Sequence, residues 1–205
     1  MRKASVYIVR VGECEYVVSE SYFYKSEAYY TIIQSEMNGR KVFPRSADIV
    51  DAYTVPICLT RSSAEGIRVC DWDISYIYAT APCLIYGIHY FSDPAQYSVL
   101  KNPEGAEELI KHVTNNGKYP FCYQRIDPGD EIVNHVTIFG RGMGMNADIQ
   151  AIAAKLFDIF RIPIMNMVLV KRNGGYSLSA LTPVSYSKLS RGELDALNAL
   201  LEARR

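Results

Sequence analysis

Strand-like segments follow one another along much of this chain without helices between them. Residues 54–91 contain four β-favouring runs, YTVPICLT, GIRVCDW, SYIYAT and CLIYGIHYF, which Ser, Gly, Asp or Pro separate. Apolar residues recur at helical spacing elsewhere, notably over residues 26–38 and 147–160. A doubly wound parallel sheet requires strands and helices to alternate regularly, which this order lacks. The pattern therefore predicts one compact α+β domain over residues 1–205, with helices packed on a mixed β-sheet.

Local end signals define several of the helices. Ser26 is the predicted N-cap of the helix over residues 26–38, and a capping box from Ser190 to Glu193 opens the last helix. Another helix is predicted in NPEGAEELIKHV, with Asn102 as its cap and Pro103 as its first residue. The sequence RNGG joins two strand-like runs, IMNMVLVK and YSLSAL, and this predicts a hairpin.

Charge and cysteine usage limit the partners and the compartment. The chain has 22 Lys and Arg residues and 22 Asp and Glu residues, so its formal net charge is zero. Nucleic acids and anionic membranes select a basic excess, and both are therefore predicted not to be partners. A near-neutral surface associates readily, so a homo-oligomer or a protein partner is expected. The five cysteines lack CxxC spacing, and no apolar run approaches 18 residues, so the sequence predicts a cytoplasmic protein with buried, reduced thiols.

A strand, three glycines and a helix follow one another in TIFGRGMGMNAD, residues 137–148. Backbone N–H groups in such a loop can bind an anion, here with Arg141 beside them. However, Met145 stands where a dinucleotide-binding motif requires glycine, and a P-loop lysine is lacking. The sequence therefore favours a tight turn, with Asn146 or Asp148 capping the helix. The alternative anion loop consists of Gly140, Gly142, Gly144 and Asn146.

Aromatic residues are concentrated in SYFYKSEAYY, residues 21–30. In an extended segment Tyr22 and Tyr24 share one face, while Tyr29 begins the helix that follows. One interpretation is an aromatic, hydroxyl-bearing wall with Lys25 at its edge, which suits a peptide or an amino acid. The other is a tyrosine-lined helix entry that packs on the sheet.

The remaining polar residues give weaker indications. His89, His112 and His135 lack metal-ligand spacing, so no metal site is predicted. Asp71 and Asp73 flank the only tryptophan; they form either a catalytic pair or a strand-end turn, and the turn is favoured. No motif marks a nucleophilic serine or cysteine, so no catalytic residue is assigned.

Two segments resemble a known family, the RimK-like ATP-grasp N-terminal domain. Residues 21–53 carry its opening motif, Ser-Tyr-x-Tyr-x-Ser-x-x-Tyr-Tyr, followed by a helix, a short strand and a second helix. Residues 139–205 are similar to its closing part, with Phe-Gly-Arg, a helix that ends Leu-Phe-x-x-Phe-x-x-Pro, a strand pair and a last helix. Residues 60–130 show no such similarity. The run from Gly142 to Gly144 departs from the family pattern.

In that family the domain precedes an ATP-grasp module, which joins a carboxylate to an amine through an acyl phosphate. The resemblance implies an α+β domain, or alternatively a Rossmann-like α/β pre-ATP-grasp fold. It implies a non-catalytic role in substrate recognition, or docking onto a separately encoded ATP-grasp peptide or amide ligase. ATP and Mg²⁺ are then expected only on that ligase, and the chain alone is not expected to be an enzyme. The implied site consists of Tyr22, Tyr24, Lys25, Tyr29 and Arg141.

Two alternatives remain open at this stage. The chain could be a stand-alone enzyme that binds a phosphorylated small molecule at the Gly140–Gly144 loop and uses Asp71 or Asp73 as a base. It could also be a structural subunit whose tyrosine wall forms a homodimer interface.

Overall fold

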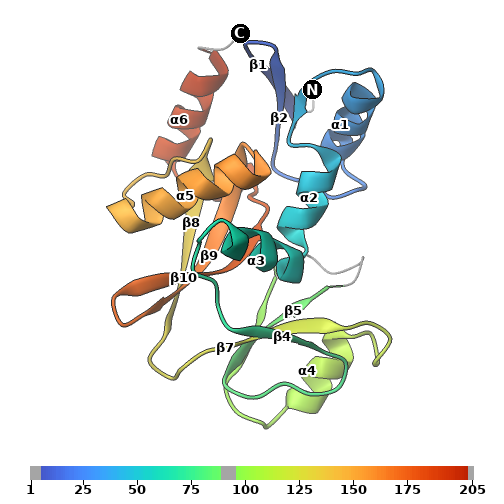
Figure 1. Ribbon diagram of the computed structural model, residues 1–205, viewed down its shortest axis with the longest axis vertical. Helices are drawn as coiled ribbons and strands as arrows, with labels where there is room; N and C mark the ends of the chain where they lie inside the picture. Colours follow the sequence, from blue (N-terminus) through green and yellow to red (C-terminus); the bar gives the residue numbers. More distant parts are fainter. Residues whose placement is uncertain (1–5, 89–95, 203–205) are drawn as a thin grey trace. The chain divides into compact units, whose positions relative to one another are not determined.

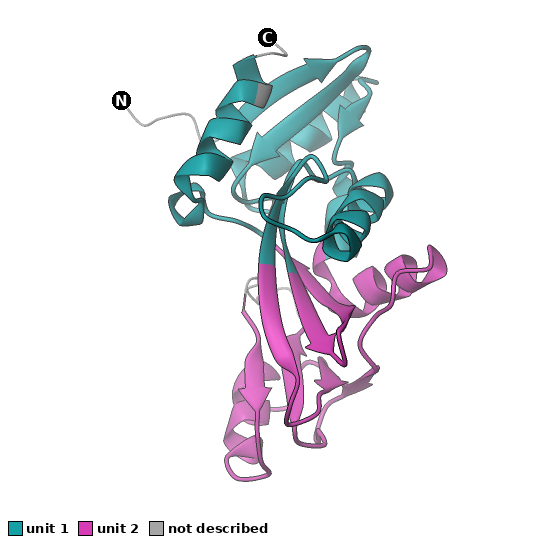
Figure 2. Cartoon of the chain, turned by 90° about the vertical axis from the view of Figure 1, so that its left-hand side faces the viewer, with its two compact units in different colours: residues 1–52, 135–167, 183–205 teal, residues 53–134, 168–182 magenta. Residues whose placement is uncertain are grey.

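The computed structural model describes residues 6–88 and 96–202 (Figure 1). The chain divides into two compact units, which are drawn in teal and magenta in Figure 2. Unit 1 comprises residues 1–52, 135–167 and 183–205, and unit 2 comprises residues 53–134 and 168–182. We expected a single domain over residues 1–205; the division into two compact units does not test that expectation, which stays a prediction. The predicted α+β class with a mixed sheet is confirmed, as the strands below show.

Unit 1 contains a three-stranded mixed sheet in the order β1-β2-β3. Strands β1 (Val6–Val11) and β2 (Cys14–Ser19) pair antiparallel, from Val6 opposite Ser19 to Val11 opposite Cys14. The short strand β3 (Val42–Phe43) pairs parallel to β2. Helix α1 (Glu27–Met37) connects β2 to β3, because a parallel neighbour requires a crossover.

Helix caps in unit 1 form where the sequence predicted them. The Ser26 side chain accepts a hydrogen bond from the Tyr29 N–H group at the start of α1. The helix α5 (Ala147–Phe160) has Asn146 as its N-cap, and helix α6 (Arg191–Glu202) follows the capping box of Ser190 and Glu193. Helix α2 (Ser46–Tyr53) follows β3.

A second sheet has the strand order β10-β9-β8. Its strands are β8 (Glu131–Ile138), β9 (Ile164–Arg172) and β10 (Gly175–Thr182), and the turn between β9 and β10 is the predicted hairpin. Residues of both β8 and β9 belong to both units. A short 3-10 turn, η1 (Tyr186–Lys188), precedes α6.

Unit 2 contains a four-stranded antiparallel sheet in the order β4-β7-β5-β6. These strands are β4 (Trp72–Ser75), β7 (Phe121–Arg125), β5 (Cys83–Gly87) and β6 (Ser98–Leu100). Helix α4 (Ala106–Val113) contributes Ile110 to a buried cluster with residues of this sheet. Helix α3 (Val55–Ala64) belongs to the same unit.

Four local predictions in unit 2 are wrong. YTVPICLT was expected to be a strand, but it forms α3, because Pro56 suits the first turn and Val55, Cys58, Leu59 and Ser62 become one buried face. Helix α4 begins after Gly105, at a φ of 77°, and not at Asn102. The run SYIYAT belongs to a strand only at Ser75, the last residue of β4, and GIRVCDW forms only an isolated bridge between Val69 and Leu178 before β4 begins at Trp72.

The side chain of Ser75 explains why SYIYAT leaves the sheet. Its Oγ atom accepts hydrogen bonds from the N–H groups of Ile77 and Tyr78, at 3.3 and 3.1 Å, which turns the chain directly after β4. The last residues of the fourth β-favouring run, from His89, lie outside the described residues.

A buried polar network joins β10 to the unit 2 sheet. Ser179 Oγ lies 2.6 Å from the Tyr86 hydroxyl and donates to Gln124 Oε1 at 2.6 Å. The Gln124 amide donates in turn to the Ser179 carbonyl at 2.8 Å. These contacts satisfy polar groups that would be costly to bury alone.

Candidate functional site

The loop between β8 and α5, residues 139–146, which we call the glycine loop, is a tight turn within unit 1 that packs closely on α5. Phe139, Gly140 and Gly144 have positive φ angles of 49°, 72° and 67°. A Cβ atom at Gly140 would lie 2.7 Å from Phe157 Cβ, so only glycine fits there. At Gly192, at the start of α6, an added Cβ would lie 2.8 Å from Met143 Cε.

The N–H groups of this loop donate to acceptors within the chain. Phe139 N–H donates to the Pro163 carbonyl, and Arg141 N–H donates to the Ile138 carbonyl, at 2.7 and 3.1 Å. Gly142 N–H donates to Gln150 Oε1 at 3.2 Å, while the Gln150 amide donates to the Gly140 carbonyl at 2.7 Å. The Gln150 side chain therefore occupies the position that an anion would take at Gly142, which supports the interpretation as a turn.

Tyr22 lies in the core of unit 1, with only 1% of its surface exposed. Its hydroxyl donates to the Val17 carbonyl at 2.9 Å and accepts from the Ser19 N–H at 3.1 Å. Tyr22 therefore fixes the end of β2 and does not present its ring to a ligand. Because the chain turns at Tyr24 and Lys25, Tyr22 and Tyr24 do not share the face expected of an extended segment.

The next residues are at the surface. Tyr24 is half-buried and packs edge-on to Phe23, with ring centroids 4.7 Å apart. Lys25 is exposed, and its ammonium lies 5.3 Å from the centre of the Tyr24 ring. Tyr29, also half-buried, is held at the first turn of α1 by the Ser26 cap. We call the group Tyr24, Lys25 and Tyr29 the tyrosine turn.

The tyrosine turn and the glycine loop are both anchored on β2. The Tyr16 ring contacts Phe139 and Phe157, at centroid distances of 5.4 and 6.2 Å, and thereby fixes the glycine loop. Tyr22 fixes the tyrosine turn at the end of the same strand. Within the described residues, no hydrogen bond or ion pair joins exposed Arg141 to residues 22–29.

The two aspartates near Trp72 have separate partners. Asp71 forms an ion pair with Arg125 at 2.8 Å, and both side chains are mostly exposed. Asp73 Oδ1 accepts the N–H of Ile74, and its Oδ2 lies 3.4 Å from the Tyr123 hydroxyl. This arrangement agrees with a strand-end turn, since each carboxylate supports the local sheet edge.

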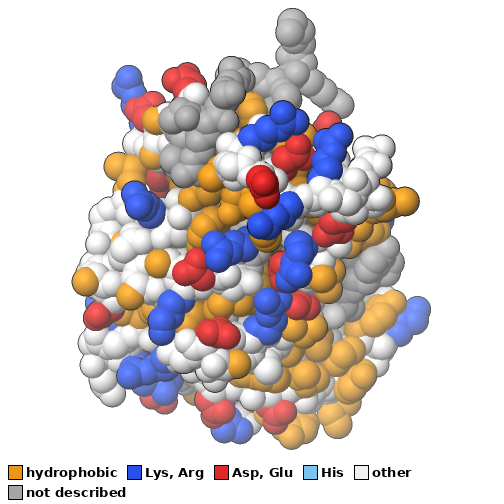
Figure 3. All heavy atoms as spheres, turned by 45° about the horizontal axis from the view of Figure 1, so that its top comes forward, with side chains coloured by type: hydrophobic (Ala, Val, Ile, Leu, Met, Phe, Trp, Pro, Cys, Tyr) orange, Lys and Arg blue, Asp and Glu red, His pale blue; other side chains and the backbone are white. Residues whose placement is uncertain are grey.

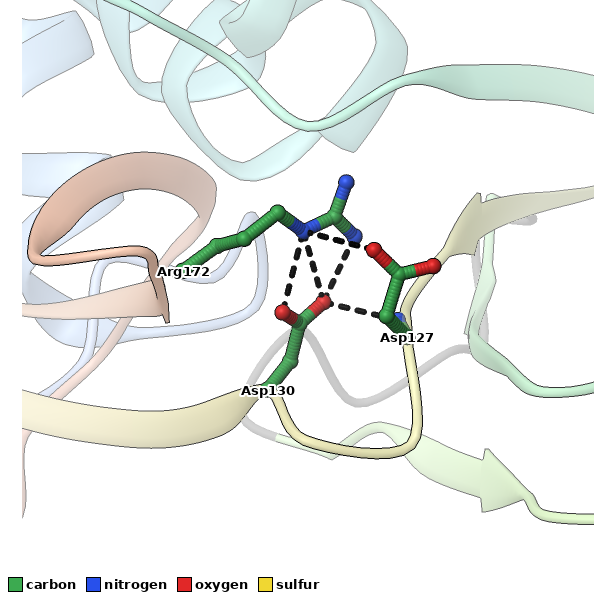
Figure 4. A network of polar contacts seen from close by, with 3 residues as sticks. All are labelled: Asp127, Asp130 and Arg172. Carbon is green, nitrogen blue, oxygen red and sulfur yellow. Dashed lines mark hydrogen bonds and ion pairs between the residues drawn. The ribbon is translucent and has the colours of Figure 1, made fainter.

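Arg172 joins the β7–β8 turn to the end of β9 (Figure 4). Its guanidinium Nη2 lies 2.6 Å from Asp130 Oδ2, and its Nε contacts Asp127 at 3.2 Å. Asp130 also accepts the N–H of Asp127 at 2.8 Å. The hydrogen bond from Arg172 and that N–H group lower the pKa of Asp130. The network stabilises a turn.

Surface charge is mixed in sign where it is visible. Figure 3 shows Lys and Arg side chains interspersed with Asp and Glu on the face presented.

Within residues 6–88 and 96–202, His, Cys, Asp and Glu form no group of three that could hold a metal ion. In the same ranges no helix has both the length and the apolar character needed to cross a bilayer.

One cavity in the structure was not predicted from the sequence. It has a volume of about 500 Å³ and lies in unit 2, between the segment 76–79 and α4. Its walls include Tyr76, Ile77, Ile110 and Lys111. The signal in the sequence was SYIYAT, whose large apolar side chains were assigned to a strand.

The family comparison supports the closing part of the resemblance stated above, extends it to residues 105–130, where the sequence alone showed none, and does not include the opening motif at residues 21–53. Residues 105–199 match the family described as RimK-like ATPgrasp N-terminal domain. No curated protein matches the chain in sequence.

Solved structures of ATP-grasp ligases have a similar fold. The D-alanine–D-alanine ligase of Bacillus anthracis gives a TM-score of 0.63 at 9% identity, over 83% of this chain and 73% of the ligase. A RimK domain ATP-grasp protein of Sphaerobacter thermophilus gives 0.62 at 14% identity, over 85% and 76%. The ATP-grasp ligase PsnB, complexed with minimal precursor, Mg and ADP, gives 0.57 at 14% identity, over 83% and 66%. At these identities the likeness establishes the fold.

The PsnB structure contains Mg and ADP, so a nucleotide with Mg²⁺ is the ligand pair to compare with this chain. The glycine loop of this chain does not fit that pair, because the Gly142 N–H donates to Gln150 Oε1 and the N–H groups of Phe139 and Arg141 donate to backbone carbonyls.

Proposed function

From the match of residues 105–199 to the family described as RimK-like ATPgrasp N-terminal domain, we propose that this chain is a recognition domain associated with ATP-dependent peptide or amide ligation. In this role it binds a peptide or amino-acid substrate, or docks onto a separate ATP-grasp ligase. ATP and Mg²⁺ act on that ligase. The fold shared with the ligases supports the association.

The tyrosine turn is the surface that we assign to recognition. The main observation in support is that the exposed Lys25 ammonium lies beside the half-buried Tyr24 ring, on a backbone held by Tyr22 and Ser26. A fixed backbone lowers the entropy cost of binding. Lys25 can pair with a carboxylate, and the Tyr24 and Tyr29 hydroxyls can form hydrogen bonds.

Arg141 is a second, separate cation of the proposed surface in unit 1. It is exposed at the glycine loop, and its guanidinium can bind a carboxylate in a bidentate manner. The turn around it is fixed by Gln150 and Phe139, so Arg141 projects from a rigid base.

The test is affinity purification of the tagged chain from native extract, followed by identification of the captured proteins. We expect an ATP-grasp ligase, and we expect its recovery to fall in Lys25→Ala and Arg141→Ala. Lys101→Ala is the matched control, because Lys101 is an exposed cation of unit 2. Equal recovery with all three variants would exclude the assigned surface.

Calorimetry with ATP and Mg²⁺ distinguishes this proposal from a stand-alone enzyme. We expect no binding to the chain alone. A saturable signal that Arg141→Ala removes would favour the enzyme instead and would contradict our proposal.

A further inference from the structure

The cavity in unit 2 is bordered by an unusual group of exposed apolar side chains. Tyr76, Ile77 and Tyr78, which line the cavity, are 52%, 78% and 59% exposed. Scattered apolar side chains are common on protein surfaces, but a contiguous group beside a cavity indicates a binding surface. The cavity volume of about 500 Å³ lies in the range of small-ligand sites.

The backbone around the cavity is well defined on both sides. The Ser75 side chain holds the N–H groups of Ile77 and Tyr78. On the other side, Thr114 Oγ1 donates to the Ile110 carbonyl at 2.6 Å and accepts the N–H of Gly117 at 2.7 Å. The opening is therefore preformed rather than a gap between two loose loops.

The polar part of the wall carries one charge of each sign. Glu107 and Lys111 stand one turn apart on α4, and the Lys111 Nζ atom lies 2.6 Å from Glu107 Oε1. Their side chains are 81% and 59% exposed, so water competes with the pair and both groups can turn toward a ligand. The wall has no net charge from these two residues, which disfavours a ligand with a large charge of either sign.

We propose that this cavity binds a free amino acid with a large apolar side chain, whose carboxylate pairs with Lys111 and whose ammonium pairs with Glu107. The apolar side chain packs against Ile110, Ala106 and the exposed rings of the 76–79 segment. A zwitterion matches two adjacent opposite charges, whereas a singly charged molecule leaves one of them, and a blocked molecule both of them, without a ligand partner.

The chosen probes are L-phenylalanine, L-leucine and N-acetyl-L-phenylalanine amide, measured by calorimetry and by amide chemical shifts on the whole chain. We expect saturable binding of the two free amino acids, with shifts at Lys111 and Gly117. The blocked amide lacks both charges and should bind at least about tenfold more weakly. Equal binding of the blocked amide, or no binding of either free amino acid, would overturn the proposal.

Charge variants complete the test. Lys111→Met and Glu107→Gln should each weaken L-phenylalanine binding about tenfold. Lys118→Met and Glu108→Gln are matched controls, because both residues are exposed nearby but do not line the cavity. Unchanged affinity in Lys111→Met, or an equal loss in its control, would refute the assignment. All four changes are at exposed positions, and the outcome is independent of the tyrosine turn, which lies in unit 1.

Discussion

The hydroxyl of Tyr22 donates a 2.9 Å hydrogen bond to the backbone carbonyl of Val17 in β2, the strand on which the tyrosine turn and the glycine loop are both anchored. The same oxygen accepts the N–H of Ser19. Tyr22 is thus a support for the tyrosine turn, and the residues available to a ligand are Tyr24, Lys25 and Tyr29.

Tyr22→Phe removes this hydroxyl and leaves two backbone groups without a partner in the core. We expect the free energy of unfolding to fall by about 1–3 kcal/mol, measured by urea denaturation. Tyr24→Phe is the control, and it should change stability by less than about 0.5 kcal/mol because Tyr24 lies at the surface. A Tyr22→Phe protein as stable as the parent would contradict the supporting role.

Gly140 and Gly144 allow two reasons for a glycine to be distinguished: a positive φ angle, and a lack of space for a Cβ atom. Both have positive φ, but only a Cβ at Gly140 would collide with another atom, Phe157 Cβ at 2.7 Å. Gly144→Ala should lose about 1 kcal/mol from its backbone conformation alone. Gly140→Ala should lose clearly more, on the order of 2–4 kcal/mol, because the collision adds to the backbone cost. Thermal unfolding midpoints of the two variants would test this order, and equal losses would refute it.

Local signals were sufficient for three of the predicted caps and for most elements, but not for the cap predicted at Asn102. Ser26, Asn146 and the pair Ser190–Glu193 act through neighbouring residues, so the sequence alone predicted them. The segment at residues 55–64 has β-favouring residues, but burial of one helical face in unit 2 overrides that preference.

The site could be predicted only in part. The sequence placed Lys25 and Tyr24 together, but it could not show that the chain turns there, because the turn depends on the contact of Tyr22 with Val17. The use of the Gly142 N–H by Gln150, eight residues further on, also depends on how α5 packs. The resemblance pointed to a domain that precedes the ligase module, whereas the shared fold covers 73% of one ligase chain.

The buried cysteines should be unreactive in the folded protein. Cys58, Cys70, Cys83 and Cys122 are buried, and Cys14 is partly exposed. Burial raises the pKa of Cys83 to about 11 and the pKa of Cys122 to about 12, so both thiols stay protonated at pH 8. Titration with a thiol reagent at pH 8 should modify about one thiol in the native state and all five in urea. Rapid modification of several native thiols would contradict this packing.

The ion pair of Arg172 and Asp130 should make the free energy of unfolding depend on pH in the acidic range. The hydrogen bond from Arg172 lowers the folded-state pKa of Asp130, so the unfolded chain binds a proton more readily. The stabilisation is therefore complete above the unfolded pKa, near 4, and is lost as pH falls through the folded pKa. Because the Arg172 side chain is 44% exposed, solvent screens the pair, and we expect it to stabilise the fold by about 1 kcal/mol or less.

Urea denaturation of the parent and of Asp130→Asn, each at pH 7 and at pH 3, tests this linkage. At pH 7 the free energy of unfolding of Asp130→Asn should be lower than that of the parent by this amount, and at pH 3 the difference should be smaller. Asp71→Asn is the matched control, because both side chains of its pair with Arg125 are mostly exposed. If the difference between the parent and Asp130→Asn is equally large at pH 7 and at pH 3, the linkage is refuted.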